Sequence, residues 1–340
     1  MTQLGGRPTP RSVDVARVAG VSQKTVSRVF NNEQYVSAAV RTRVLEAAEQ
    51  LGYRLNNAAR ALASGRTRSI GVVALGTALY GPASLLVGIE RAARETGYAL
   101  RVTNTADSDP AGVAGAVESL LDQGVDGIVI SEPIDEGEVS VRVDVPVLVY
   151  GAPAAFAGAR AVTAGVRADL LARAATEHLL DLGHRTVHHL AGPQRWYSAR
   201  DRLEGWRAAL ADRGLPEPSV VEGDWSAASG YEVGRELAAD DTVTAVFAAN
   251  DDMAIGLIRA LREARRRVPA DVSVVGFDDI PVADFISPRL TTVRQPFDAV
   301  AKTGLELLVH AIEKPDADPL PVSDPPVELV VRASTAPPPH

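Results

Sequence analysis

Hydrophobic and polar positions follow two different patterns along this chain, and the change falls near residue 69. Before that point, apolar residues recur every three or four positions, which predicts short amphipathic helices. After it, short runs rich in valine, isoleucine and alanine alternate with helical segments, which predicts two α/β lobes with largely parallel sheets. Strands are expected at residues 69–75, 99–105, 127–130, 145–149, 186–190, 243–248 and 272–277 and near Val220, and helices at residues 82–96, 110–123 and 169–182.

A tight break at residues 19–22 separates the first two helices, which are expected over residues 12–19 and 23–31. Small or apolar residues stand where two such helices must cross closely: Ala16, Gly20, Val21 and Val26. Ser22 can cap the second helix, because its hydroxyl can accept a first-turn N–H group. Polar side chains follow this cap, namely Gln23, Lys24, Thr25, Ser27 and Arg28. A recognition helix needs such a face to reach base edges in a major groove, although an ordinary helical pair with a solvated face fits the same pattern.

A third helix over residues 38–51 is expected to cover the first two. Ser12 and Ser37 are the expected caps of the first and third helices, and Gly52 stops the third. The expected buried stripe is Val40, Val44, Leu45, Ala48 and Leu51. The next stretch, residues 53–65, contains good helix formers but has no apolar face wide enough to pack a helix by itself. It is also too short to be a stable helix alone in water. It is either a plain linker or a linker that becomes helical on DNA, with Leu62 as an apolar wedge in the minor groove.

Charge is unevenly divided between these two parts of the chain. The formal net charge is −8, but residues 1–68 contain 11 lysine and arginine residues against 4 acidic ones. The remaining 272 residues contain 24 against 39. A basic head is attracted to phosphates, whereas an acidic body is repelled by them. The head is therefore the part expected to contact nucleic acid.

The composition excludes several classes of protein. A length of 340 residues suits two or three domains, and the absence of cysteine excludes disulfides, thiolate metal sites and cysteine nucleophiles. We expect a cytoplasmic protein with no membrane partner, because neither a signal peptide nor an apolar run of about 18 residues is found. Phosphate-binding loops and a nucleophile elbow are missing, and the six histidines do not form a metal set. No catalytic residue, metal or cofactor is therefore expected.

Ligands of folds with parallel sheets bind beyond the carboxyl ends of the strands, here in the cleft between the two lobes. The candidate residues all follow expected strands: Leu79, Tyr80, Pro82, Arg202, Trp225, Asn250, Asp278, Gln295 and Phe297. Together they suit a sugar, because an indole stacks on the apolar face of a pyranose while forked donors and acceptors hold pairs of hydroxyls. Each residue also has a purely structural interpretation. Asn250 can cap a helix, Asp278 can be a turn residue, Arg202 can pair with Glu204, and Trp225 can be part of the core.

Three segments of the head, DVARVAGVSQKTVSRVFN, VSAAVRTRVLEAAEQLGY and NNAARALASGRTRSIGVV, resemble the DNA-binding headpiece and hinge of the lac repressor family. The resemblance continues to about residue 332, through LYGPAS, ARDRLEGW, EGDWSAASG, ANDDMAIG, SVVGFDD and LTTVRQPF, which look like effector-pocket segments of the lactose-type members. It implies that Gln23, Lys24 and Arg28 read bases and that Leu62 is the hinge leucine. The other DNA-contacting residues that it implies are Thr25, Ser27, Asn31 and Asn56. Two residues depart from the family pattern: Leu55 replaces a usual proline, and Gly151 replaces an aspartate that lactose-type members present to a sugar hydroxyl.

We therefore expect an all-α helix-turn-helix headpiece joined to an α/β two-lobed effector domain like the type I periplasmic binding proteins. The headpiece spans residues 1–54, the hinge helix and linker 55–68, the effector-binding and dimerisation domain 69–332, and a disordered tail 333–340. The expected function is a transcriptional repressor whose affinity for double-stranded operator DNA is controlled by a sugar or glycoside, with a galactoside-like effector. The resemblance also implies a homodimer, because tetrameric assembly in the family uses a C-terminal leucine-heptad helix that this chain does not have. The alternatives are a regulator with a nucleobase or phosphorylated metabolite as co-repressor, and an α/β enzyme with an incidental helical head.

Overall fold

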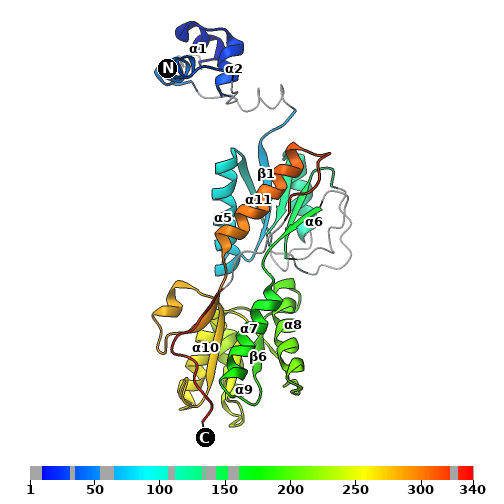
Figure 1. The fold of residues 1–340 in the computed structure, drawn as a ribbon, viewed down its shortest axis with the longest axis vertical. Helices are drawn as coiled ribbons and strands as arrows, with labels where there is room; N and C mark the ends of the chain where they lie inside the picture. The colour runs from blue at the N-terminus through cyan, green and yellow to red at the C-terminus, as the bar shows by residue number, and fades with distance from the viewer. Residues whose placement is uncertain are drawn as a thin grey trace, which may run out of the picture. The chain divides into compact units, whose positions relative to one another are not determined.

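The computed structural model describes residues 10–30, 35–53, 65–105, 112–131, 134, 143–151, 161–321 and 328–339 (Figure 1). The chain divides into two units, Met1–Thr67 and Arg68–His340. This division falls within the hinge and linker predicted for residues 55–68. Three residues of the DNA-binding prediction lie outside the described residues, namely Asn31, Asn56 and Leu62, and so does Leu55, which replaces the usual proline.

The first unit contains three short helices, α1 (Ser12–Ala19), α2 (Gln23–Phe30) and α3 (Ala38–Leu51). Their buried apolar residues form one core of Val15, Ala16, Ala19, Val26, Val29, Val44, Ala47 and Ala48. Gly20 joins α1 to α2 with a φ of 66°, a left-handed conformation that costs glycine little. The predicted helix-turn-helix geometry of the first two helices is therefore present.

The helix ends confirm one predicted cap and correct another. The Ser22 hydroxyl accepts the N–H of Thr25 at 3.1 Å, as predicted. The prediction that Ser12 caps α1 is wrong, because Ser12 is already helical and the Asp14 carboxylate accepts the N–H of Arg11 at 3.0 Å instead. Ser37 occupies the N-cap position of α3 without a side-chain cap hydrogen bond.

The predicted buried stripe of α3 is wrong at one position. Leu45 is 47% exposed, whereas Ala47 is buried together with Val44 and Ala48. Residues three and four apart share a helix face, so a stripe through Val44, Ala47 and Ala48 turns Leu45 outward. The buried stripe is thus set by the helical period and not by the size of the apolar side chain.

The first lobe of the second unit has a five-stranded sheet in the order β2-β1-β3-β4-β5, with every neighbouring pair parallel. Its strands are β1 (Ser69–Leu75), β2 (Ala99–Thr105), β3 (Gly127–Ile130), β4 (Val147–Tyr150) and β5 (Ala161–Ala164). Its helices are α5 (Tyr80–Thr96), α6 (Gly112–Asp122) and α11 (Phe297–Glu313). Ile70 and Val72 point to α5 and α11, which lie side by side, whereas Val73 and Ile128 point to α6 (Figure 1). Both faces of the sheet are thus covered.

The second lobe has a six-stranded sheet in the order β11-β10-β9-β8-β6-β7, parallel except for β11. Its strands are β6 (His188–Ala191), β7 (Val221–Glu222), β8 (Ala245–Ala248), β9 (Ser273–Asp278), β10 (Thr291–Arg294) and β11 (Glu328–Val330). Its helices are α7 (Ala168–Asp181), α8 (Tyr197–Asp212), α9 (Ala227–Ala238), α10 (Asp251–Glu263) and the 3-10 turn η1 (Pro281–Asp284). Phe247 and Val275 pack against α7 and α8, whereas Val246 and Val274 pack against α9 and α10. The alternation of buried residues along two neighbouring strands thus places helices on both faces.

Two features of the second unit differ from the prediction. Strand β5 was not predicted, because its sequence Ala161-Val162-Thr163-Ala164 lies in a stretch rich in alanine and glycine. The prediction of a disordered tail is wrong near residue 334, which is fully buried. Ser334 accepts the N–H of Val274 on its carbonyl at 2.8 Å and the N–H of Thr291 on its hydroxyl at 2.8 Å. These bonds hold the segment against β9 and β10.

None of the described helices is both long enough and apolar enough to span a membrane.

Candidate functional site

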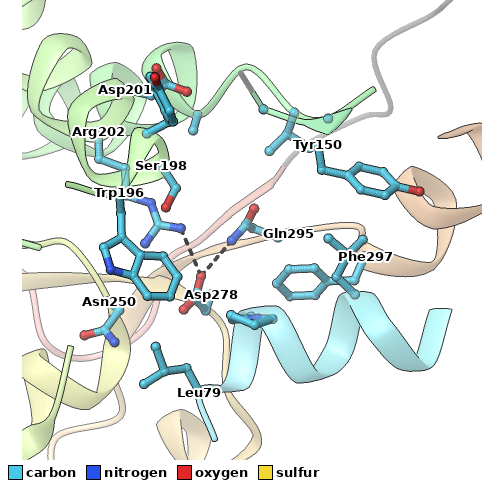
Figure 2. A pocket seen from close by; sticks show the side chains of 18 of the residues that line it. Leu79, Tyr150, Trp196, Ser198, Asp201, Arg202, Asn250, Asp278, Gln295 and Phe297 are labelled. Atoms are coloured by element: carbon cyan, nitrogen blue, oxygen red, sulfur yellow. Dashed lines mark hydrogen bonds and ion pairs between the residues drawn. The ribbon is translucent and has the colours of Figure 1, made fainter. Parts of the chain in front are cut away.

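A cavity lies between the two lobes of the second unit (Figure 2). All nine residues predicted for the cleft line it: Leu79, Tyr80, Pro82, Arg202, Trp225, Asn250, Asp278, Gln295 and Phe297. Asn250 lies in the two-residue bend between β8 and α10, Asp278 ends β9, and Gln295 follows β10. Because parallel strands end at one edge of their sheet, these side chains are brought together there.

A buried ionic group occupies the centre of the cavity. The Gln295 amide donates to the Asp278 carboxylate at 2.7 Å, and the Arg202 guanidinium lies 3.6 Å from the same oxygen. Arg202 also donates to the carbonyl of Ala249 at 2.5 Å, and its guanidinium lies over the ring of Phe277 at 4.0 Å. Arg202 therefore pairs with Asp278, and the alternative pairing with Glu204 is wrong.

The Asp278 carboxylate is held in an unfavourable place for a charge. Burial raises the pKa of Asp278 to about 6, although the charge of Arg202 and the hydrogen bond from Gln295 lower it. Its backbone has a φ of 112°, which a non-glycine residue rarely adopts. Such strain at a buried, charged residue is typical of functional sites.

Asn250 has both of the roles considered for it, as the cap of a helix and as a residue of the cavity. Its side-chain oxygen caps α10 by accepting the N–H of Met253 at 2.9 Å. Its amide nitrogen donates to the carbonyl of Trp225 at 2.9 Å. Asn250 therefore fixes the loop that carries Trp225, while it also lines the cavity.

Two aromatic pairs form walls of the cavity. Trp196 and Trp225 meet edge to face with their ring centroids 5.8 Å apart, and Tyr80 and Phe297 do so at 6.0 Å. The indole nitrogen of Trp225 and the Nε of Arg202 are buried and have no hydrogen-bond partner within the described part of the chain. Buried N–H groups are normally satisfied. Both residues line the cavity, so its wall contains two unsatisfied N–H donors.

Several lining residues were not predicted: Tyr150, Trp196, Tyr197, Ser198 and Asp201. Trp196 pairs through its backbone with Ile134 of the first lobe, and a Cβ on Gly76 would lie 2.6 Å from its ring. Trp196 thus contacts both lobes. Its position directly before the helix that carries Arg202 is the sequence feature that could have indicated a role in the cavity.

The first unit presents the predicted recognition residues on one side of α2. Val26 and Val29 are buried, whereas Gln23, Lys24, Ser27 and Arg28 are exposed, and Thr25 is half-buried. The Gln23 amide donates to the Ser12 hydroxyl at 2.8 Å. Residues 23, 24, 27 and 28 share a face because they are spaced by one helical turn. The arrangement suits base reading, provided that this face enters a major groove.

Among the residues that the structure describes, no three histidine or acidic side chains gather in a way that could hold a metal ion. His189 is fully buried, and its ring stacks on those of Trp206 and Phe247. Burial lowers the pKa of His189 to about 4, and its Nδ1 bonds the carbonyl of Phe247 at 2.9 Å. This histidine is therefore a neutral core residue near pH 7.

Both units match known families. Residues 13–56 match the family described as bacterial regulatory proteins, lacI family, and residues 176–335 match a periplasmic binding protein-like domain. The chain is 36% identical to the lactose operon repressor of Escherichia coli K12, over 87% of this chain and 83% of the relative. It is 35% identical to the ribose operon repressor of the same strain, over 89% and 93%. These nearly equal identities do not set lactose-type members apart from ribose-type ones.

The fold also matches a solved structure over both units. The lac repressor dimer bound to operator and the anti-inducer ONPF aligns with a TM-score of 0.80 and 33% identity, covering 96% of this chain and 99% of that one. The chain therefore belongs to the lacI family of bacterial regulatory proteins, and it is a transcriptional repressor with a helix-turn-helix head and an effector-binding domain rather than an enzyme.

Proposed function

We propose that this repressor is a homodimer that binds a near-palindromic operator and releases or retains it according to a sugar or glycoside in the cleft. The observation that carries the proposal is the buried Asp278–Arg202–Gln295 group beside two aromatic walls. A carboxylate acceptor, guanidinium and indole donors, and flat apolar rings are the groups that recognise a polyhydroxylated ring. Relatives named for lactose and ribose operons support this class of effector.

The DNA half of the proposal rests on α2. Gln23, Lys24 and Arg28 are proposed to read base edges, with Thr25 and Ser27 beside them on the same helix. Asn31, Asn56 and the hinge residue Leu62 keep their predicted roles as part of the proposal. A dimer presents two such helices to two half-sites, in line with the operator-bound dimer of the lac repressor.

A polyanionic effector is disfavoured by the charges of the cleft. In the described part of the chain, its charged lining residues are Asp201, Arg202 and Asp278, two carboxylates against one guanidinium. The guanidinium is already paired with Asp278. A phosphorylated ligand would meet an excess of negative charge.

A screen of small molecules tests the proposed effector. Mono- and disaccharides, nucleobases and sugar phosphates are added to the full-length protein, and the melting temperature is measured. A sugar that raises the melting temperature should also change the affinity for operator DNA in a gel-shift titration, since binding and operator affinity are linked. Stabilisation by a nucleobase or a sugar phosphate, with no effect of any sugar, would contradict the proposal.

Sugar affinity is expected to fall at acid pH through Asp278. A sugar hydroxyl donates to the ionised carboxylate, and protonation of Asp278 competes with that bond. Because the pKa of Asp278 is raised to about 6, affinity should be constant above pH 7 and fall toward about tenfold per pH unit well below pH 6. Isothermal titration of the wild type and of Asp278→Asn between pH 5 and 8 measures this. The variant should bind more weakly at pH 7 and show a flatter profile, and a profile as steep as that of the wild type would exclude Asp278.

A further inference from the structure

Asp201 is a second carboxylate of the cavity, and the recognition scheme above does not use it. It lies in the first turns of α8, one residue before Arg202, and is half-buried. Figure 2 shows it at the α8 side of the pocket, apart from Asp278 and Gln295. Within the described part of the chain, its carboxylate has no hydrogen bond or ion pair. It thus differs from Asp278, which has both.

The charges around Asp201 do not neutralise it. Burial raises the pKa of Asp201 to about 6, and Asp169 and Glu204 act in the same direction. Arg202 and Arg167 lower that pKa. However, Arg202 pairs with Asp278, and Arg167 is held by both oxygens of Asp169 at 2.9 and 2.6 Å. Among the described residues that line the cavity, Asp201 is therefore the carboxylate without a paired cation at pH 7.

The other walls of the cavity suit a positive group. Six aromatic residues line it: Tyr80, Tyr150, Trp196, Tyr197, Trp225 and Phe297. Ring faces attract cations, and a desolvated carboxylate gains most from a partner with a full charge. On the first lobe, Gly151 provides no side chain, and a Cβ there would meet nothing within 4 Å. Among the lining residues that the structure describes, the acceptors with full charge are thus Asp278 and Asp201.

We propose that the effector carries a protonated amine beside its hydroxyl groups, as an amino sugar does, and that Asp201 accepts hydrogen bonds from that amine. The inference rests on the proposed sugar-binding function and narrows its ligand class. Asp278 and Gln295 then hold the hydroxyl end, while Asp201 determines specificity at the other end.

Matched sugars test this inference on the full-length protein. D-Galactosamine, N-acetyl-D-galactosamine and D-galactose, with the three gluco counterparts, are titrated calorimetrically at pH 7. The free amine should bind about tenfold or more tightly than its neutral counterparts, because a charge-assisted hydrogen bond replaces a neutral one. In Asp201→Asn the ratio of affinities should fall to about one. Asp201→Ser serves as a second variant if the first is unstable.

Glu204→Gln is the matched control. Glu204 lies on the same helix and carries the same charge, but it is exposed and does not line the cavity. The control should keep the preference for the amine, and the wild-type preference should shrink between pH 7 and pH 5 as Asp201 becomes protonated.

Three other results of these titrations would contradict the inference. If neutral sugars bind the wild type as tightly as the amines, the inference fails and the proposed function stands. If Glu204→Gln loses the preference as fully as Asp201→Asn, the attraction is long-range and the assignment to Asp201 fails. If none of these six sugars binds, the inference fails for this class of amino sugar, and the wider screen of mono- and disaccharides described above decides the proposed function.

Discussion

Replacing Arg28 with alanine is expected to remove most of the preference for operator over other DNA. Arg28 is exposed on the polar side of α2, whereas the neighbouring Val26 and Val29 hold the helix in the head. A good bidentate contact to a base contributes about 1–3 kcal/mol to discrimination, and a dimer makes it twice, so the loss should be about 2–6 kcal/mol. The head should keep its fold, because the side chain is not part of the core.

The measurement requires an operator, which is first selected from random duplexes with the wild-type protein. Binding of the selected duplex and of a scrambled duplex is then titrated by fluorescence anisotropy at one fixed salt concentration. Arg43→Ala is the control, since Arg43 is an exposed arginine on α3 and removes the same charge. It should weaken both duplexes similarly. An unchanged ratio of the two affinities in Arg28→Ala would remove Arg28 from base reading.

Replacing Arg202 with methionine is expected to destabilise the second unit by about 3–5 kcal/mol at pH 7. The change leaves the buried Asp278 carboxylate without its cation, and breaking a buried pair on one side costs about this much. Arg207→Met is the control on the same helix, because its ion pair with Glu217 is half exposed and should contribute at most about 1 kcal/mol.

The stability lost in Arg202→Met should be smaller at pH 5 than at pH 7. Without Arg202, the pKa of Asp278 in the folded protein rises further above its value in the unfolded chain. The folded variant therefore binds a proton at a higher pH than the unfolded variant, so it regains stability as the pH falls from 7 to 5. Chemical denaturation at both pH values measures this, and adding Asp278→Asn should recover part of the loss at pH 7. A loss below about 1 kcal/mol at pH 7, equal at both pH values, would show that Asp278 does not depend on Arg202.

The cleft could be predicted from sequence because of a simple topological rule. Asn250, Asp278 and Gln295 follow the ends of β8, β9 and β10, and parallel strands bring such residues to one edge. Trp196 and Asp201 lie in the same segment after β6 as Arg202 but were not predicted, because the end of a strand does not tell which residues of the following turn and helix face the cavity. Trp196 also pairs through its backbone with Ile134 of the other lobe. Such a contact between distant segments has no local signal.

Contacts between distant segments also decide other parts of the fold that the local sequence does not predict. Residue 334 looked like part of a disordered tail, yet its hydroxyl bonds residues 43 and 60 positions away in the sequence. In the head, the apolar period placed α3 correctly, but it could not tell Leu45 from Ala47 at the edge of the stripe. Local pattern therefore indicated the elements, and tertiary packing decided which side chains were buried.

The positions of the three tryptophans make the intrinsic fluorescence of this repressor sensitive to occupancy of the cleft. Trp196 and Trp225 lie edge to face in the cleft, so their fluorescence reports directly on what enters it. Trp206 is sealed in the second lobe and donates its indole N–H to the carbonyl of Val187 at 2.8 Å, so its emission serves as an internal reference. Occupancy of the cleft can thus be followed in the unlabelled protein, in real time and with DNA present.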